Sequence, residues 1–145
     1  MRKKENGFTL IELMVTIAVL AIIAMMAAPS FGDLVQKQQL KKSTNELIGV
    51  LSQARSKAIL ERRNVKVELH ESETILSANS QTIMYWMPYG ETVLTSSVKE
   101  IVFGLSGGVV GASADTTFVL CGNGVKQVIA VSRMGTVQQV DKGVC

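Results

Sequence analysis

Apolar and polar residues follow two different patterns in the first third of the chain. Most residues from Phe8 to Phe31 are apolar, whereas from Gly32 onward apolar residues recur at spacings of three and four. That spacing places apolar side chains on one face of a helix. We therefore predict one helix from about Phe8 to about Glu61, apolar all round in its first half and amphipathic in its second. The amphipathic stripe consists of Leu34, Leu47, Ile48, Leu51, Ala54, Ala58 and Ile59.

Beyond Arg63 the pattern changes from helical to alternating. The segment Val65 to His70 alternates apolar and polar residues, which is typical of a half-buried strand. Glycines separate it from further strand candidates. The predicted fold class is α+β, with a long N-terminal helix packed through its second half on a C-terminal antiparallel β-sheet domain. The other predicted strands are Thr82–Met87, Glu91–Thr95, Glu100–Phe103, Thr116–Cys121, Gln127–Val131 and Thr136–Val140.

The charges before the apolar segment indicate how the N-terminus is oriented. The formal net charge of the chain is +3, and the segment before Gly7 supplies most of it through Arg2, Lys3 and Lys4, offset by Glu5. Cations on the N-terminal side of an apolar run indicate a membrane span with a cytoplasmic N-terminus. A run of roughly 20 apolar residues is long enough to cross a bilayer. An ordinary secretory signal, cleaved after the apolar core, is the alternative.

One carboxylate lies at the start of the apolar segment. An ionised Glu12 inside a membrane span costs roughly 3 kcal/mol, so this side chain needs a partner or a function. A snorkelling interfacial residue of a simple anchor is the alternative interpretation. The carboxylate belongs to the sequence Gly-Phe-Thr-Leu-Ile-Glu, which runs from Gly7 to Glu12 between the basic stretch and the apolar helix.

This junction resembles the class III signal of type IV pilins and type II secretion pseudopilins. The resemblance implies that a prepilin peptidase cleaves after Gly7 on the cytoplasmic face and that the new N-terminal Phe8 is N-methylated. It also implies that the apolar segment stays in the mature protein and that Glu12 pairs with the N-terminal amine of a neighbouring subunit. Such a pair makes a buried carboxylate tolerable in an apolar bundle.

The rest of the chain resembles the GspH/FimT group of minor pilins and pseudopilins. The resemblance rests on chain length, the order of helix and strands, the late cysteines and the phrase Val-Ile-Ala-Val-Ser-x-x-Gly that ends at Gly135. It implies four segments: a leader peptide at 1–7, a transmembrane and assembly half of the helix at 8–31, an amphipathic half at 32–63, and a β-rich globular domain at 64–145.

The two cysteines, Cys121 and Cys145, fall in the part that would lie in the periplasm. An even pair in that compartment indicates a disulfide. Closing a loop of about 25 residues stabilises the fold by roughly 3 kcal/mol in the chain-entropy model. Two free thiols or a metal site are the alternatives, but His70 is the one histidine and no second ligand has suitable spacing. We expect no metal and no other cofactor.

Catalytic chemistry finds little support in the sequence. A single histidine gives no Ser-His-Asp arrangement, and no glycine-rich phosphate loop follows a strand as nucleotide binding requires. The carboxylates Glu68, Glu71 and Glu73 around His70 are typical of a solvated edge. We therefore expect a structural protein with no catalytic residues.

DNA binding is a competing function. Some FimT-type minor pilins capture DNA through a Gly-Arg-x-Arg motif, and the matching positions here, Gly135 to Gln138, read Gly-Thr-Val-Gln. Both arginines are missing. Lys126, Arg133 and Lys142 remain as candidate DNA contacts, but three scattered cations make a weak electrostatic footprint.

The sequence thus predicts a minor pilin that helps to initiate assembly of type IV pili and caps them, in machines for twitching motility, adhesion or DNA uptake. A FimT-like DNA-binding pilin and a GspH-like pseudopilin of type II secretion are the alternatives. The expected location is the bacterial inner membrane, crossed once with the C-terminal domain in the periplasm, and then the fibre. Expected partners are the prepilin peptidase, other minor pilins, the major pilin and the membrane, with DNA less favoured.

Overall fold

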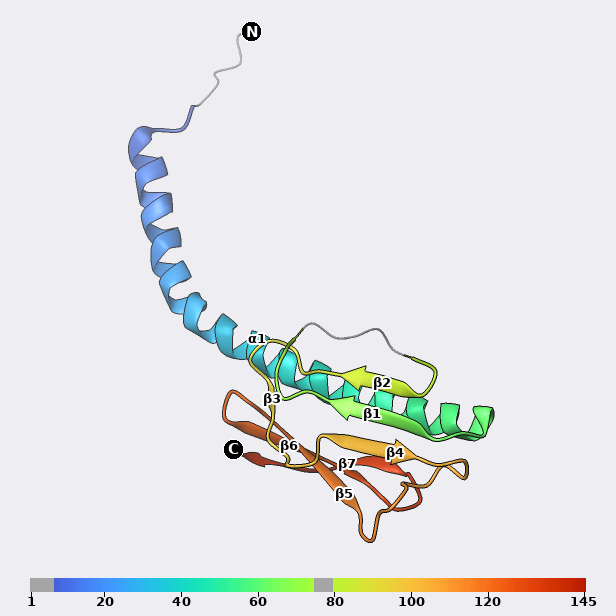
Figure 1. Cartoon of the computed structure of the whole chain (residues 1–145). Coiled ribbons are helices and arrows are strands. Elements are labelled where there is room, and N and C mark those ends of the chain that lie inside the picture. Colours follow the sequence, from blue (N-terminus) through green and yellow to red (C-terminus); the bar gives the residue numbers. More distant parts are fainter. Residues whose placement is uncertain (1–6, 75–79) are drawn as a thin grey trace. The chain divides into compact units, whose positions relative to one another are not determined.

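The structure, a computed structural model, describes residues 7–74 and 80–145, except for the side chains of residues 27–30. The described residues form one long helix followed by strands, so the predicted α+β fold is confirmed (Figure 1). All the predicted strands are present, and the last of them continues beyond its predicted end. The elements are α1 (Leu10–Glu61), β1 (Val65–Leu69), β2 (Ile83–Trp86), β3 (Val93–Leu94), β4 (Glu100–Phe103), β5 (Thr116–Gly122), β6 (Val125–Val131) and β7 (Val137–Val144).

The chain divides into two compact units, residues 1–34 and residues 35–145. The first unit contains the apolar part of α1, and the second contains the amphipathic part together with all the strands. The core of the protein therefore lies in the second unit.

Local hydrogen bonds determine where α1 begins and ends. Thr9 caps its start, because the Thr9 hydroxyl accepts the N–H of Glu12 at 3.3 Å and the Thr9 carbonyl accepts the N–H of Leu13 at 3.2 Å. At the other end Arg62 adopts a left-handed conformation with φ 49°, and the N–H of Arg63 donates to the carbonyl of Ala58. A left-handed residue followed by such a bond is a common helix stop.

The strands form two sheets. One has the order β2-β1-β4 and the other has the order β3-β5-β6-β7. Every pair in the second sheet is antiparallel, whereas β1 pairs antiparallel with β4 and parallel with β2. A parallel pair needs a long crossover, which the residues between Leu69 and Ile83 provide. The alternating pattern predicted the strands but neither the division into two sheets nor the parallel pair.

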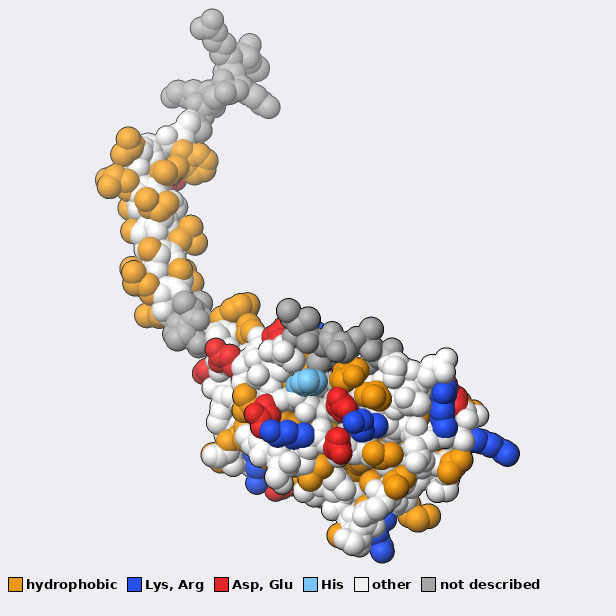
Figure 2. Space-filling view, in the orientation of Figure 1, with side chains coloured by type: hydrophobic (Ala, Val, Ile, Leu, Met, Phe, Trp, Pro, Cys, Tyr) orange, Lys and Arg blue, Asp and Glu red, His pale blue; other side chains and the backbone are white. Residues whose placement is uncertain are grey.

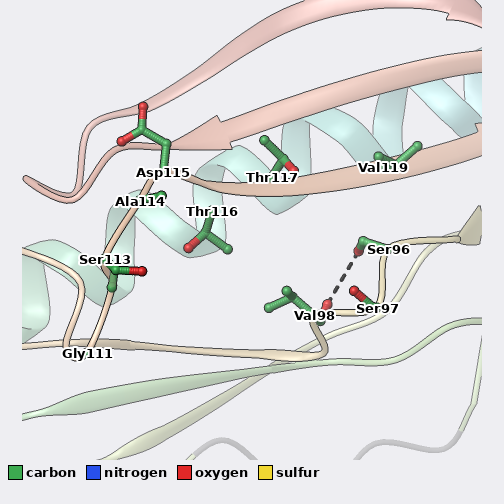
Figure 3. Close-up of a pocket in the computed structure, with 11 residues that line it drawn as sticks. Ser96, Ser97, Val98, Gly111, Ser113, Ala114, Asp115, Thr116, Thr117 and Val119 are labelled. Atoms are coloured by element: carbon green, nitrogen blue, oxygen red, sulfur yellow. Dashed lines mark hydrogen bonds between the residues drawn. The ribbon is translucent and has the colours of Figure 1, made fainter.

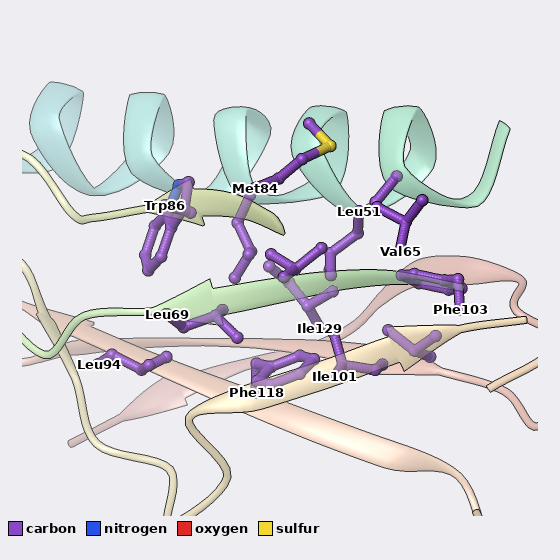
Figure 4. Close-up of a cluster of buried hydrophobic side chains, with 14 of the residues drawn as sticks. Leu51, Val65, Leu69, Met84, Trp86, Leu94, Ile101, Phe103, Phe118 and Ile129 are labelled. Atoms are coloured by element: carbon purple, nitrogen blue, oxygen red, sulfur yellow. The ribbon is translucent and has the colours of Figure 1, made fainter. Parts of the chain in front are cut away.

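The core lies between the amphipathic part of α1 and the two sheets (Figure 4). Leu47, Leu51, Ala54 and Ala58 are fully buried, as the stripe predicted. The sheets contribute Val65, Val67, Leu69, Met84, Trp86, Leu94, Ile101, Phe103, Phe118, Leu120, Ile129 and Val131.

Two residues of the predicted stripe are exposed, and Ile48 is partly buried. Leu34 is 54% exposed and Ile59 is 44% exposed. Leu34 belongs to the first unit, which contributes no residue to the core. Polar Ser43 and Thr44 are buried instead, and their hydroxyls donate to the carbonyls of the preceding turn at 2.8 Å. Because these hydroxyls are satisfied within the helix, they can lie in the core.

The loop between β4 and β5, residues 104–115, consists mainly of small residues. It forms hydrogen bonds with the helix and with the turn between β6 and β7. Nε of Arg55 on α1 donates to the carbonyl of Gly107 at 3.1 Å, and Gly107 has φ 81°. The N–H of Val109 donates to the carbonyl of Arg133 at 2.9 Å. The loop thus joins elements that are far apart in sequence.

Candidate assembly segment and lysine groove

The residues that the sequence marks for processing and assembly lie at the start of α1. Gly7 and Phe8 precede the helix, and Phe8 is 84% exposed. Glu12 lies in the first helical turn, where a negative charge is favourable. Within the described part of the chain, the Glu12 carboxylate forms no ion pair.

Apolar side chains cover the first half of α1 and are exposed in the isolated chain (Figure 2). Leu10 is 79% exposed, and Leu20 and Ile23 are each more than half exposed. Large exposed apolar patches mark contacts with membranes or with other proteins. Judged by length and composition, no single described helix meets the requirements of a membrane span, but Leu10–Met26 and Phe31–Glu61 meet them together as a broken pair.

A disulfide joins Cys121, on β5, to Cys145, which follows β7. The two Cα atoms are 6.1 Å apart, and the N–H of Cys145 donates to the carbonyl of Gly124 at 3.1 Å. The bond closes a loop that contains all of β6 and β7. Among the described residues no group of His, Cys, Asp or Glu side chains is placed to hold a metal ion.

A groove of about 330 Å³ lies between α1 and the helix-facing side of β6 and β7. We call it the lysine groove, because three lysines line it and none of its lining residues is acidic. Strand residues Gln127 and Lys142 are paired across β6 and β7, so both side chains face the helix. The lining residues are Lys37, Lys41, Thr44, Asn45, Val125, Gln127, Gln139 and Lys142.

The three candidate DNA contacts do not form one patch. Lys142 lines the lysine groove, whereas Lys126 is paired with Gly143 and therefore points to the opposite face of the sheet. Arg133 lies in the turn at the far end of β6, about 20 Å from Lys126 at the usual rise of a strand. There the N–H of Arg133 donates to a carboxylate oxygen of Asp115 at 3.2 Å.

Sequence reasoning missed Lys37 and Lys41. They are four residues apart on α1, so they lie on one helix face, which is the signal that could have marked them. Nothing in the sequence places them beside Lys142, more than a hundred residues later, because that neighbourhood depends on the pairing of β6 with β7.

Two lysines on and beside the three-stranded sheet are paired, whereas the lysines of the groove form no ion pair with any residue that the structure describes. Lys66 pairs with Glu68 and Glu100, and Nζ of Lys99 lies 2.6 Å from a carboxylate oxygen of Glu71. Figure 2 shows basic and acidic side chains intermixed near the histidine, which is drawn in pale blue. The hydrogen bond from Lys66 to Glu68 raises the pKa of Lys66, and the one from Lys99 lowers the pKa of Glu71.

These ion pairs explain the acidic residues around His70. Glu68 and Glu71 are held by lysines, and Glu73 accepts the N–H of Gly90 at 3.1 Å. The His70 ring is 6.3 Å from the ring of Tyr85, measured between centroids. Each of the three carboxylates therefore has a structural partner.

A second cavity, of about 450 Å³, lies beside the first half of β5 (Figure 3). Its walls are mainly small or hydroxyl-bearing residues of the segments 96–98 and 111–117. The hydroxyl of Ser96 donates to the carbonyl of Val98 at 3.4 Å. Asp115 is the one charged residue in its lining. No basic residue in this lining could activate a hydroxyl as a nucleophile.

Comparisons with known families match two separate parts of the chain. Residues 2–28 match the profile described as the prokaryotic N-terminal methylation motif. Residues 43–135, more than half of the chain, match the family described as type II transport protein GspH.

Fibre subunits are among the similar sequences. A fimbrial protein of Pseudomonas aeruginosa is 32% identical over 92 residues, which are 63% of this chain and 53% of that protein. A type IV major alpha-pilin of Moraxella bovis is 44% identical over 43 residues, which are 30% of this chain and 27% of that protein. The chain therefore matches about half, or less, of the length of these relatives.

The fold is similar to that of a solved minor pilin. Two crystal structures of the type IV minor pilin FimU of Pseudomonas aeruginosa match with TM-scores of 0.52 and 0.55. The sequences are 23% and 22% identical, and the matches cover 70% and 74% of this chain and 92% of the solved chains. At this identity the similarity concerns the fold.

Proposed function

Because this chain belongs to the GspH family of type II transport proteins and carries a prepilin methylation motif, we propose that it is a structural minor pilin of a type IV pilus. In this role it takes part in initiating the fibre and caps its tip. The observation that carries the proposal is the first half of α1, an uncovered apolar helix that directly follows the processing motif.

Each part of the N-terminal segment has a role in this proposal. Cleavage after Gly7 creates the Phe8 amine, which is then methylated. Before assembly the apolar half of α1 anchors the chain in the inner membrane, and the second unit lies in the periplasm. During assembly the apolar half leaves the lipid for the helices of neighbouring subunits, and Glu12 receives the cationic amine of one of them. Pairing offsets much of the cost of burying that carboxylate.

The second unit supports a structural role. The described cavities contain no activated nucleophile and no group of metal ligands, and the similar sequences bear the names of fibre subunits. The disulfide strengthens the sheet that the unit would present at the fibre surface. We therefore propose that the unit functions through contacts with other subunits.

Two other functions are less well supported. The name of the GspH family favours a pseudopilin of type II secretion, whereas the fimbrial relatives and the FimU-like fold favour a pilus. A FimT-like DNA receptor would need Lys126, Arg133 and Lys142 in one patch, and these side chains lie apart. The proposal of a minor pilin therefore remains the preferred one.

Deletion of the gene tests the proposal. We expect cells without the chain to lose most surface pili and to recover them when the wild-type chain is restored. Loss of type II secretion with normal piliation would support a pseudopilin instead. Loss of DNA uptake alone, reproduced by Arg133→Ala or Lys126→Ala, would support a DNA receptor.

A further inference from the structure

We propose that the lysine groove binds an acidic, extended segment of another polypeptide. The inference rests on the proposed function only in that it takes this polypeptide to be a neighbouring subunit. The groove belongs to the second unit and is separate from the N-terminal segment through which the helices assemble.

The first observation is that the three lysines of the groove lack acidic partners in the part of the chain that the structure describes. Within the described residues, none of Lys37, Lys41 and Lys142 forms an ion pair, although Lys66 and Lys99 both do. Asp141 lies next to Lys142 in sequence, but it is paired with Val128 on the opposite face of the sheet. Cations gathered in a recess whose lining contains no acidic residue raise the local positive potential. An anionic ligand would relieve that potential.

The second observation is the strand that forms one wall of the groove. β7 is the last strand in the order β3-β5-β6-β7, so one of its edges has no partner strand within residues 7–74 and 80–145. Its side chains from Gln138 to Lys142 are exposed. A free strand edge offers main-chain donors and acceptors at regular spacing, and an added polypeptide strand satisfies them. A nucleic acid or a lipid headgroup cannot pair with the edge in this way.

The third observation is the remaining lining of the groove. It contains amides and a hydroxyl, from Asn45, Gln127, Gln139 and Thr44, and no aromatic side chain. Proteins that bind single-stranded nucleic acids generally stack the bases on aromatic side chains. The amide of Gln139 donates to that of Gln127, so part of this polar wall is already ordered. The lining thus favours a polypeptide with carboxylates over a nucleic acid.

The three observations together define the occupant. Its main chain lies along the free edge of β7. In a strand alternate side chains share one face, so carboxylates at every second position would all face Lys37, Lys41 and Lys142.

Binding of a hexaglutamate peptide to the full-length protein in detergent tests the inference. Fluorescence anisotropy should show binding at low salt that weakens as salt is added. The double variant Lys41→Gln/Lys142→Gln should weaken binding about fivefold or more, since each exposed ion pair contributes modestly. The matched control Lys66→Gln/Lys99→Gln removes the same net charge from the other sheet and should leave binding unchanged.

Three results would overturn the inference. The first is that hexaglutamate does not bind at low salt, and the second is that both double variants weaken its binding equally. The third is that an oligothymidylate of equal charge binds more tightly than hexaglutamate through the same lysines. The last result would assign the groove to nucleic acid. In addition, hexaglutamate should slow amide hydrogen exchange in β7, and unchanged exchange there would refute strand pairing.

The proposed function can fail separately. If the chain is not a minor pilin, deleting its gene leaves piliation normal, whatever the groove binds. If the groove has no acidic ligand, peptide binding is absent while piliation still depends on the chain.

Discussion

The carbonyl oxygen of Gly107 occupies the space that a β-carbon on Gly135 would need. Gly135 has φ 80°, and Arg55 donates to the same Gly107 carbonyl. The helix, the loop after β4 and the turn between β6 and β7 therefore meet at a point where no side chain fits. This contact gives a physical reason for the glycine that ends the phrase Val-Ile-Ala-Val-Ser-x-x-Gly.

We predict that Gly135→Ala destabilises the fold by about 2–4 kcal/mol, because it adds a clash with backbone to the cost of a left-handed conformation. Gly111→Ala is the control, since Gly111 has φ 75° but nothing within 4 Å of the added carbon. In that control the free energy of unfolding should fall by only about 1–2 kcal/mol. Urea unfolding of both variants measures the difference, and equal losses would show that the contact with Gly107 is unimportant.

Processing gives the second prediction. The mature N-terminus should begin at Phe8 and carry one methyl group, because the chain matches the prepilin methylation motif. Mass spectrometry of the protein from its native host measures both changes. A mature chain that begins near Ser30 would indicate an ordinary signal peptide and would exclude the pilin proposal.

The third prediction concerns Glu12. Glu12→Ala should stay in the membrane, since the anchor loses a costly charge. Its incorporation into fibres should fall severalfold, because assembly loses the partner of an amine. Quantitative blots of sheared fibres and of membranes measure both pools. Glu61→Ala, which removes an exposed carboxylate from the other end of α1, is the control, and normal recovery of Glu12→Ala in fibres would contradict the prediction.

The disulfide gives the fourth prediction. Reduction should lower the melting temperature by roughly 10 °C, because the loop closed by Cys121 and Cys145 is worth about 3 kcal/mol. Calorimetry with and without reductant measures the shift. The double variant Cys121→Ser/Cys145→Ser should melt at the lower temperature and be insensitive to reductant. Two titratable thiols in the native protein would contradict the bond.

The fifth prediction is a pH dependence at Glu71. Its pKa is lowered by Lys99, so the pair stabilises the fold above the unfolded pKa of the carboxyl and ceases to do so as the pH falls through the folded value. Lys99→Gln should move the pKa of Glu71 back up, with little change in stability because both groups are exposed. An NMR titration of the Glu71 carboxyl carbon measures this. Lys66→Gln is the control, and an unchanged titration in Lys99→Gln would contradict the assignment.

Sequence patterns predicted the helix and the strands of this fold better than they predicted which strands pair with one another. The burial of Leu51 and Ala54 and the strand at Val65 follow from helical and alternating periods, which are local properties. The parallel pairing of β1 with β2 depends on a crossover, and no period in the sequence encodes it. Leu34 has the spacing of the stripe but lies outside the core, because spacing is local and does not show which turns of the helix pack on the sheets.

The candidate sites also differ in how far the sequence alone reveals them. Gly7, Phe8 and Glu12 form one continuous motif, so the sequence was sufficient to mark them as candidates. The lysine groove depends on Lys37 and Lys142, which only the folded chain brings together. Conversely, Lys126 and Lys142 are close in sequence, but the alternation of a strand places them on opposite faces of the sheet.

The bond between Cys121 and Cys145 also determines how the chain responds to tension. β6 and β7 lie inside the closed loop, whose ends are separated by 24 residues. A fully extended residue spans about 3.3–3.6 Å, so the residues of the closed loop correspond to roughly 80 Å of contour length. The intact bond prevents this length from being extended. A molecule pulled at Phe8 and Cys145 can therefore be drawn out only as far as Cys121. A force–extension trace recorded with reductant should be longer by that amount.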